Sequence, residues 1–190
     1  MIRRPPRSTL SSSSAASDVY KRQLDNNIIS QHEIANIKAH GSDGGFGVTA
    51  QLYHNTLDSA SYGIYQDGYA YSLASNNIIS NHTIQGVYKS PTSTGNTINL
   101  AHSLYYGNND DGDSDMDMNN SPVYGDPAYW DATNGNYHIR AHSAARDKSL
   151  GEGYAYDIDG NSRPIGSSST PYDIGADEFM GWFLPLIQRP

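Results

Sequence analysis

The sequence has no cysteine, no long apolar run and few basic residues, and each absence excludes a class of protein. Without cysteine, the 190 residues form no disulfide framework, thiolate zinc site or cysteine nucleophile, and the redox compartment stays open. No run of about 18 apolar residues is present to cross a bilayer as a helix. The 12 basic residues are outnumbered by 20 acidic ones, which argues against a phosphate-binding surface and a nucleic-acid partner.

Polar turn-forming residues and tyrosine dominate what is present. Only 36% of the residues are hydrophobic, while 18 are glycine and 15 are tyrosine. Because Asn, Gly and Ser supply turns and Tyr favours strands, this composition predicts turn-rich β structure.

Residues 1–23 differ from the rest of the chain in charge. They hold five of the 12 basic residues and a single acid, Asp18, and no apolar segment follows the arginines as in a signal peptide. We expect this leader to be disordered and to contribute nothing to the fold. It resembles translated sequencing-adapter read-through, which implies a non-native leader and missing upstream coils. An ordinary disordered basic arm is the alternative.

From residue 24 a short pattern recurs along the chain. The pentapeptide NNIIS at 26–30 returns unchanged at 76–80, and related pentapeptides lie at 54–58 and 102–106. Their alignment gives one polar column at spacings of 28, 22 and 26 residues: Asn27, Asn55, Asn77 and Ser103. It also gives two apolar columns: Ile29, Leu57, Ile79 and Tyr105, and then Ile37, Ile64 and Val87.

This repeat predicts a solenoid. One copy, with about three short strands, cannot bury an apolar face alone, whereas stacked copies pair in parallel and turn each apolar column into an internal ladder. Asn tolerates the left-handed conformation of a turn, and its amide bonds along a stack, which accounts for the polar column. We therefore expect an all-β fold, a right-handed parallel β-helix of about three to four coils over 24–109. An all-β sandwich with accidental repetition is the alternative.

An acidic loop over residues 110–121 follows the coils. Its alternating acids offer oxygen ligands for weak calcium binding: Asp111, Asp113, Asp115 and Asp117. The loop lacks the Gly and Glu that close a tight calcium hand, and a solvated acidic linker is the alternative. No other cofactor is expected.

Residues 122–179 carry an ordered set of motifs: DP at 126–127, GNYHI at 135–139, DIDGNSRP at 157–164 and DIGADEF at 173–179. Together with the coils, they resemble the C-terminal part of bacterial secreted or surface β-helix proteins of the pectin-lyase-like superfamily, several of which are labelled choice-of-anchor. The resemblance implies a β-helix scaffold. The lack of a long apolar run gives the separate expectation of no membrane span in this fragment. Arg146 departs from the family pattern, which has an aliphatic residue there.

A solenoid needs a cap at its open end, and residues 122–179 are expected to form one that is rich in β structure and turns. Arg163 is expected to pair with Asp173, Asp177 or Glu178 and to fix this cap, so these acids are read as structural. A tail of residues 180–190 follows.

Five tyrosines around the second and third coils are the candidate carbohydrate-binding residues: Tyr62, Tyr65, Tyr69, Tyr71 and Tyr88. No catalytic residue is assigned, since the coils contain no arginine and no repeated pair of carboxylates aimed at one sugar bond. His32 and His82 follow the polar column in equivalent turns and are read as solvated.

The function expected from the sequence is therefore a non-enzymatic, secreted or cell-surface scaffold that is adhesive or binds a cell-surface or environmental polysaccharide. The alternative is a truncated polysaccharide lyase or glycoside hydrolase whose catalytic coils are missing.

Overall fold

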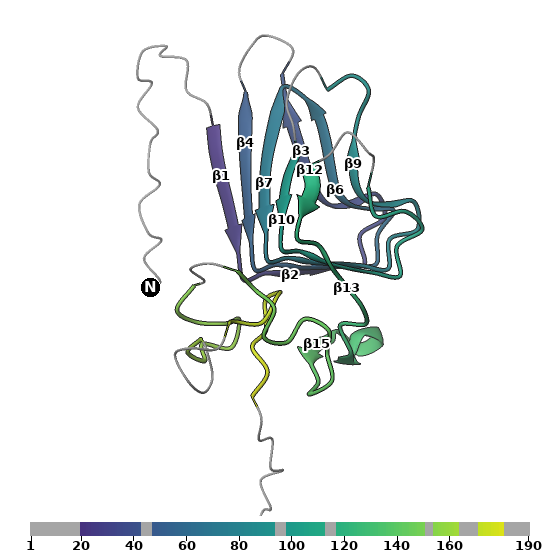
Figure 1. The fold of residues 1–190 in the computed structure, drawn as a ribbon. Coiled ribbons are helices and arrows are strands. Elements are labelled where there is room, and N and C mark those ends of the chain that lie inside the picture. Colours follow the sequence, from purple (N-terminus) through teal and green to yellow (C-terminus); the bar gives the residue numbers. More distant parts are fainter. Residues whose placement is uncertain are drawn as a thin grey trace, which may run out of the picture.

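The computed structural model describes residues 20–42, 47–93, 98–112, 117–150, 154–163 and 171–180. Within these residues, short strands wind into a parallel β-solenoid of about 3 turns (Figure 1). None of the helical structure in this described part has the length and apolar character needed to cross a bilayer. The predicted all-β, parallel solenoid fold is confirmed.

Each turn passes through three parallel sheets, called A, B and C. Sheet A is formed by β1 (Tyr20–Asp25), β4 (Val48–Tyr53), β7 (Ala70–Ser75), β10 (Ile98–Ala101) and β12 (Asp117–Asn120). Sheet B is formed by β2 (Ile28–Ser30), β5 (Thr56–Asp58), β8 (Ile78–Ser80), β11 (Leu104–Tyr106) and β13 (Val123–Tyr124). Sheet C is formed by β3 (Ala35–Gly41), β6 (Tyr62–Gly68) and β9 (Gln85–Lys89).

Both predicted apolar columns are ladders inside the coils. In sheet B the paired residues are Ile29, Leu57, Ile79 and Tyr105. In sheet C they are Ile37, Ile64 and Val87. The members from the middle coils are 0% exposed, and burial of one such aliphatic side chain contributes about 1.5–3 kcal/mol. Burial of these ladders thus stabilises the register in which the strands of successive turns pair.

The predicted polar column is a hydrogen-bonded ladder at the corner between sheets A and B. Asn55 Oδ1 accepts from the backbone N–H of Asn27 at 3.0 Å and from its Nδ2 at 3.1 Å. Asn77 Oδ1 accepts in the same way from Asn55, at 2.9 and 3.1 Å. Ser103 Oγ accepts from the N–H of Asn77 at 3.3 Å. Each of these side-chain oxygens therefore accepts a hydrogen bond from a backbone N–H of the preceding coil.

The ladder residues do not themselves adopt the left-handed conformation, so that part of the explanation is wrong. The positive φ angles, between 45° and 56°, belong to the residues just before them: Asn26, His54, Asn76 and His102. The corner turns at this preceding residue, which leaves the ladder residue free to point its side chain along the stack.

The first strand begins earlier than the sequence predicts. Residues 20–23 belong to β1 and pair in parallel with residues 48–51 of β4. The boundary placed at residue 24 is therefore wrong, because parallel pairing uses backbone groups and needs no apolar periodicity in an edge strand. Residues 1–19 and 181–190 lie outside the described residues, so the remaining leader and the tail stay predictions.

The C-terminal module begins later than the predicted residue 122, because Val123 and Tyr124 pair with β11 in sheet B. Defined here as residues 126–180, the module lies against the outer face of sheet B rather than over the open end of the coils (Figure 1). Its hairpin consists of β14 (Tyr129–Asp131), a 3₁₀ turn (Ala132–Asn134) and β15 (Asn136–Ile139). Ile78 and Leu104 of sheet B pack on Ile139 and Ile174 of the module. The expected terminal cap is thus a lateral cover, because the outer face of sheet B is apolar and must be shielded from water.

Candidate functional site

Three of the five predicted tyrosines form a cluster on sheet C, called here the tyrosine cluster. The ring centroids of Tyr62 and Tyr65 are 5.2 Å apart, and each lies 5.0 Å from the ring of Tyr88. Ile64 and Gln66 on either side of Tyr65 are buried inside the coil, so Tyr65 points outward. The outer face of sheet C therefore carries the aromatic rings.

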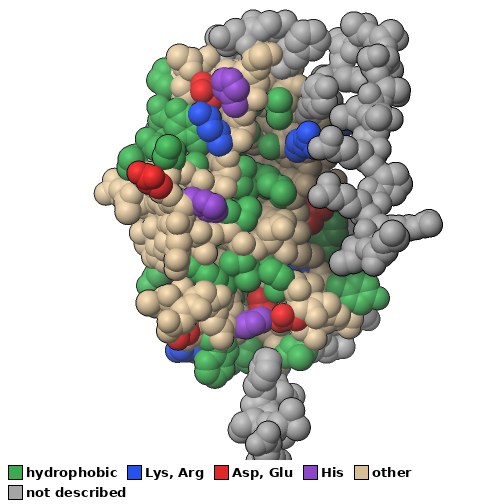
Figure 2. Space-filling model, turned by 180° about the vertical axis from the view of Figure 1, so that it is seen from behind, with side chains coloured by type: hydrophobic (Ala, Val, Ile, Leu, Met, Phe, Trp, Pro, Cys, Tyr) green, Lys and Arg blue, Asp and Glu red, His purple; other side chains and the backbone are tan. Residues whose placement is uncertain are grey.

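Polar groups border this cluster. The Nζ of Lys38 lies 5.2 Å from the centroid of the Tyr65 ring, close enough for a cation–π contact. Asp67, two residues beyond Tyr65 on the same face, accepts from the Thr92 hydroxyl at 2.8 Å and lies 3.3 Å from His40 Nδ1. The Thr92 hydrogen bond, with smaller contributions from Gly68 and His40, lowers the pKa of Asp67. Figure 2 shows hydrophobic side chains near the top of this face, beside a basic, an acidic and a histidine side chain.

The other two predicted tyrosines lie elsewhere. Tyr69 occupies the turn between β6 and β7 and is 38% exposed, whereas Tyr71 lies on β7 in sheet A. Sequence proximity grouped all five, but the turn at Gly68, with a φ of 59°, directs the chain from one sheet to the next.

The predicted calcium ligands are only partly described. Asp113 and Asp115 lie outside the described residues, and Asp117 begins β12, with its side chain also outside them. The Oδ1 of Asp111 accepts from Asn108 Nδ2 at 2.9 Å. Calcium binding by this loop stays a prediction.

Two polar side chains inside the molecule have structural partners. Asp58, 1% exposed, accepts from Ser80 Oγ at 2.6 Å and from Tyr137 of the module at 3.2 Å. His82 is also 1% exposed, and its ring nitrogens lie 2.6 Å from Asn36 Oδ1 and 2.7 Å from Asn108 Oδ1. The expectation of a solvated turn is wrong for His82, whose ring fills the space beside Gly63.

Arg163 makes one of the predicted ion pairs inside the module and also contacts the coils, which the sequence did not predict. Its Nη1 lies 3.4 Å from Glu178 Oε2 and 3.2 Å from His54 Nδ1, and its Nη2 lies 3.4 Å from Asn26 Oδ1. Asp173 contributes its backbone carbonyl at 3.1 Å. The side chain therefore binds one carboxylate of the predicted three while reaching the corners of the first two coils.

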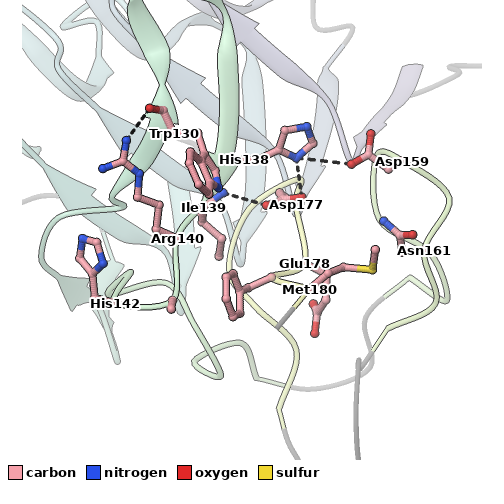
Figure 3. A pocket seen from close by; sticks show the side chains of 12 residues that line it. Trp130, His138, Ile139, Arg140, His142, Asp159, Asn161, Asp177, Glu178 and Met180 are labelled. Atoms are coloured by element: carbon pink, nitrogen blue, oxygen red, sulfur yellow. Dashed lines mark hydrogen bonds and ion pairs between the residues drawn. The ribbon is translucent and has the colours of Figure 1, made fainter. Parts of the chain in front are cut away.

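A cavity of about 270 Å³ lies in the module, and sequence reasoning did not find it (Figure 3). His138 Nδ1 lies 2.9 Å from Asp177 Oδ1 and 3.4 Å from Asp159 Oδ2 at its wall. Burial opposes protonation of His138, but these carboxylates outweigh it, so the pKa of His138 is raised. Figure 2 likewise shows a histidine beside two acidic side chains low on the molecule.

The histidine and the two aspartates come from three separate segments, so no spacing in the sequence indicates that they meet. The only indication in the sequence that these residues matter is that they lie within three recognisable motifs, GNYHI, DIDGNSRP and DIGADEF. Their order identifies a module but gives no pairing between its parts.

The fold and its surfaces define the class of the protein: a parallel β-solenoid with a C-terminal module packed on one side. Comparisons with protein-family models, curated proteins and solved structures found no match to the chain. The resemblance to pectin-lyase-like surface proteins therefore stays a prediction beyond the level of the fold.

Proposed function

We propose that this chain is a non-enzymatic β-solenoid scaffold that binds polysaccharide through the outer face of sheet C, at a cell surface or outside the cell. The observation that carries the proposal is the tyrosine cluster. Its three rings are within 5.0–5.2 Å of one another and are bordered by Lys38 and Asp67. Aromatic rings stack on sugar rings, while charged and amide groups bond to sugar hydroxyls.

The arrangement of the face supports a chain-like ligand. Tyr65 and Tyr88 are register partners in adjacent coils, and Lys38 is the partner of Tyr65 in the preceding coil. Neighbouring parallel strands are about 4.8 Å apart, so these three side chains form a row across the coils. A row of contacts suits an extended polymer better than a compact small molecule.

The positions of Asp58 and Asp67 support binding over hydrolysis on sheet C. Asp58 is buried under the module in sheet B, and Asp67 lies on sheet C, so these two carboxylates do not flank one bond. Retaining or inverting glycosidases need two carboxyl groups about 5–9.5 Å apart across the scissile bond. The scaffold proposal therefore places recognition, and no cleavage, on this face.

Affinity electrophoresis in gels that contain pectate, alginate or arabinan tests the proposal. We expect at least one polymer to retard the protein. The double variant Tyr65→Ala/Tyr88→Ala should weaken the retardation, by roughly two- to tenfold in affinity for each ring removed.

Tyr69→Ala is the matched control, because Tyr69 is an exposed tyrosine that lies off the cluster. It should retain binding, and circular dichroism should show that all three proteins remain folded. No retardation in any of these polymers, or equal loss in the control, contradicts glycan binding by this face. New reducing or unsaturated sugar ends would instead support the lyase or hydrolase alternative.

A further inference from the structure

We propose that His138, Asp159 and Asp177 form a binding site for a divalent transition-metal ion, with zinc the best fit. The site is separate from the tyrosine cluster. It lies in the module, which packs on the outer face of sheet B, whereas the tyrosine cluster lies on sheet C. The His138, Asp159 and Asp177 side chains each offer a ligand atom, and these atoms all lie within 4.8 Å of one another.

The distances suit a small ion. Zinc binds imidazole nitrogen and carboxylate oxygen at about 2.0–2.2 Å, so tetrahedral ligands lie about 3.4 Å apart. The separation of His138 Nδ1 from Asp159 Oδ2 is 3.4 Å, and its separation from Asp177 Oδ1 is 2.9 Å. For an ion to lie between all three atoms, the second pair must open by about half an ångström, and the two carboxylate oxygens, which lie within 4.8 Å of each other, must also be about 3.4 Å apart.

The donor set also suits zinc in charge and type. One neutral imidazole and two carboxylates balance a divalent ion, and nitrogen donors favour zinc over magnesium or calcium, which prefer oxygen alone. In the present arrangement His138 Nδ1 hydrogen-bonds to Asp177, and an ion would displace the proton of that bond.

Surrounding hydrogen bonds hold the ligands in place. Asp177 Oδ2 accepts from the backbone N–H of Ile139 at 2.8 Å, which leaves its Oδ1 toward His138. Asp157 Oδ1 accepts from the N–H of Asp159 at 2.9 Å and of Asn161 at 2.8 Å, so the turn that carries Asp159 is fixed. Such outer contacts orient metal ligands.

The cavity leaves room beside the ion. Figure 3 shows His138 and the two aspartates at one side of a space that is also lined by Trp130 and Asn161. Three protein ligands plus an open fourth position is the arrangement of zinc sites that take up a water or another oxygen ligand. The ion would also tie together β15, the turn at 157–161 and the segment 171–180.

Zinc titration of the full, untagged chain after chelator dialysis tests this proposal. Isothermal calorimetry should show saturable binding near one ion per chain, and the melting temperature should rise with zinc. His138→Ala and Asp159→Asn should each weaken zinc binding by at least about tenfold. Cobalt in place of zinc should give the visible absorption of a four-coordinate nitrogen–oxygen site.

His142→Ala is the matched control, because His142 lines the same cavity but is not among the three ligands. It should bind zinc as the unmodified chain does. Absence of zinc binding overturns the proposal, as does equal affinity in His138→Ala or an equal loss in His142→Ala.

Discussion

In the coils, the buried amides of the polar ladder bond to the equivalent residue one turn away, whereas in the C-terminal module the buried polar groups have partners of different kinds. Asn55 and Asn77 repeat one pattern of hydrogen bonds. Arg163 instead contacts a carboxylate, an imidazole and several carbonyl oxygens. Repetition thus stabilises one region, and a unique network of charged groups stabilises the other.

This difference indicates how much stability each region should lose when one side chain is replaced. A ladder distributes its bonds over several coils, so loss of one member leaves the others paired. The module depends on a few buried charges, and removing one partner of a buried ion pair leaves the other without compensation.

Arg163→Met should have the largest effect. Its guanidinium is 0% exposed and lies 3.4 Å from Glu178, so the substitution leaves a buried carboxylate without its cation. We expect a loss of about 3–5 kcal/mol in the free energy of unfolding, measured by urea denaturation. Limited proteolysis should then cut within the module before it cuts the coils.

Arg146→Met is the control for Arg163. The Arg146 pair with Asp147, at 3.5 Å, is 43% and 48% exposed, and such pairs contribute about 0–1 kcal/mol. Similar losses from the two substitutions would show that the module does not depend on its buried charge.

Asn77→Ala should have an intermediate effect on the coils. It removes the acceptor of the Asn55 backbone and side-chain N–H groups and the donor to the Leu52 carbonyl at 2.9 Å. Leaving such buried groups unpaired costs about 1–3 kcal/mol, again measured by urea denaturation.

Asn27→Ala provides the comparison with Asn77→Ala, because Asn27 is the first described residue of the ladder and is only partly buried. Its loss should cost less, about 0.5–1.5 kcal/mol. If the end position costs as much as the middle one, the ladder does not derive its strength from stacking between coils.

The expected effect at His54 is a pH dependence of stability, no larger than the losses expected at Arg163 and Asn77. Burial, and then the charge of Arg163, lowers the pKa of His54 from 6.5 to about 3. Between these values the unfolded chain binds a proton that the native protein excludes, so stability falls as the pH drops below 6.5. The loss should reach about 1 kcal/mol by about pH 5.5.

Urea denaturation of His54→Gln at several pH values checks this contribution. The variant should lose less stability than the unmodified chain over that interval. An unchanged slope in His54→Gln would show that His54 is not held neutral in the native protein.

The coils could be predicted because their stabilising contacts recur at a fixed period. Ile29, Leu57 and Ile79 stack because equivalent strands must pair in register, and the sequence alignment of the repeats is the same alignment as the strand pairing. The sequence predicts the left-handed conformation at Asn77, but the structure has it at Asn76. Two neighbouring Asn residues tolerate this conformation equally, so the sequence does not choose between them.

The site could be predicted only in part. Tyr62, Tyr65 and Tyr88 come together because two coils place them on one face, and the repeat indicates this. Tyr69 lies in the turn after β6 and Tyr71 lies on sheet A, and no periodic signal marks that turn. The doubled isoleucines, as at Ile78 and Ile79, contained a further signal that both faces of sheet B are buried.

The sequence by itself determined the solenoid, its interior ladders and its asparagine stack, because these depend on contacts between equivalent residues of successive coils. Only the tertiary structure decided that the module covers the side of sheet B, that Arg163 reaches the corners at Asn26 and His54, and that His138 meets two aspartates. Those contacts join segments with no common period. Their geometry follows from how the turns of the module pack on an apolar face, which no local pattern encodes.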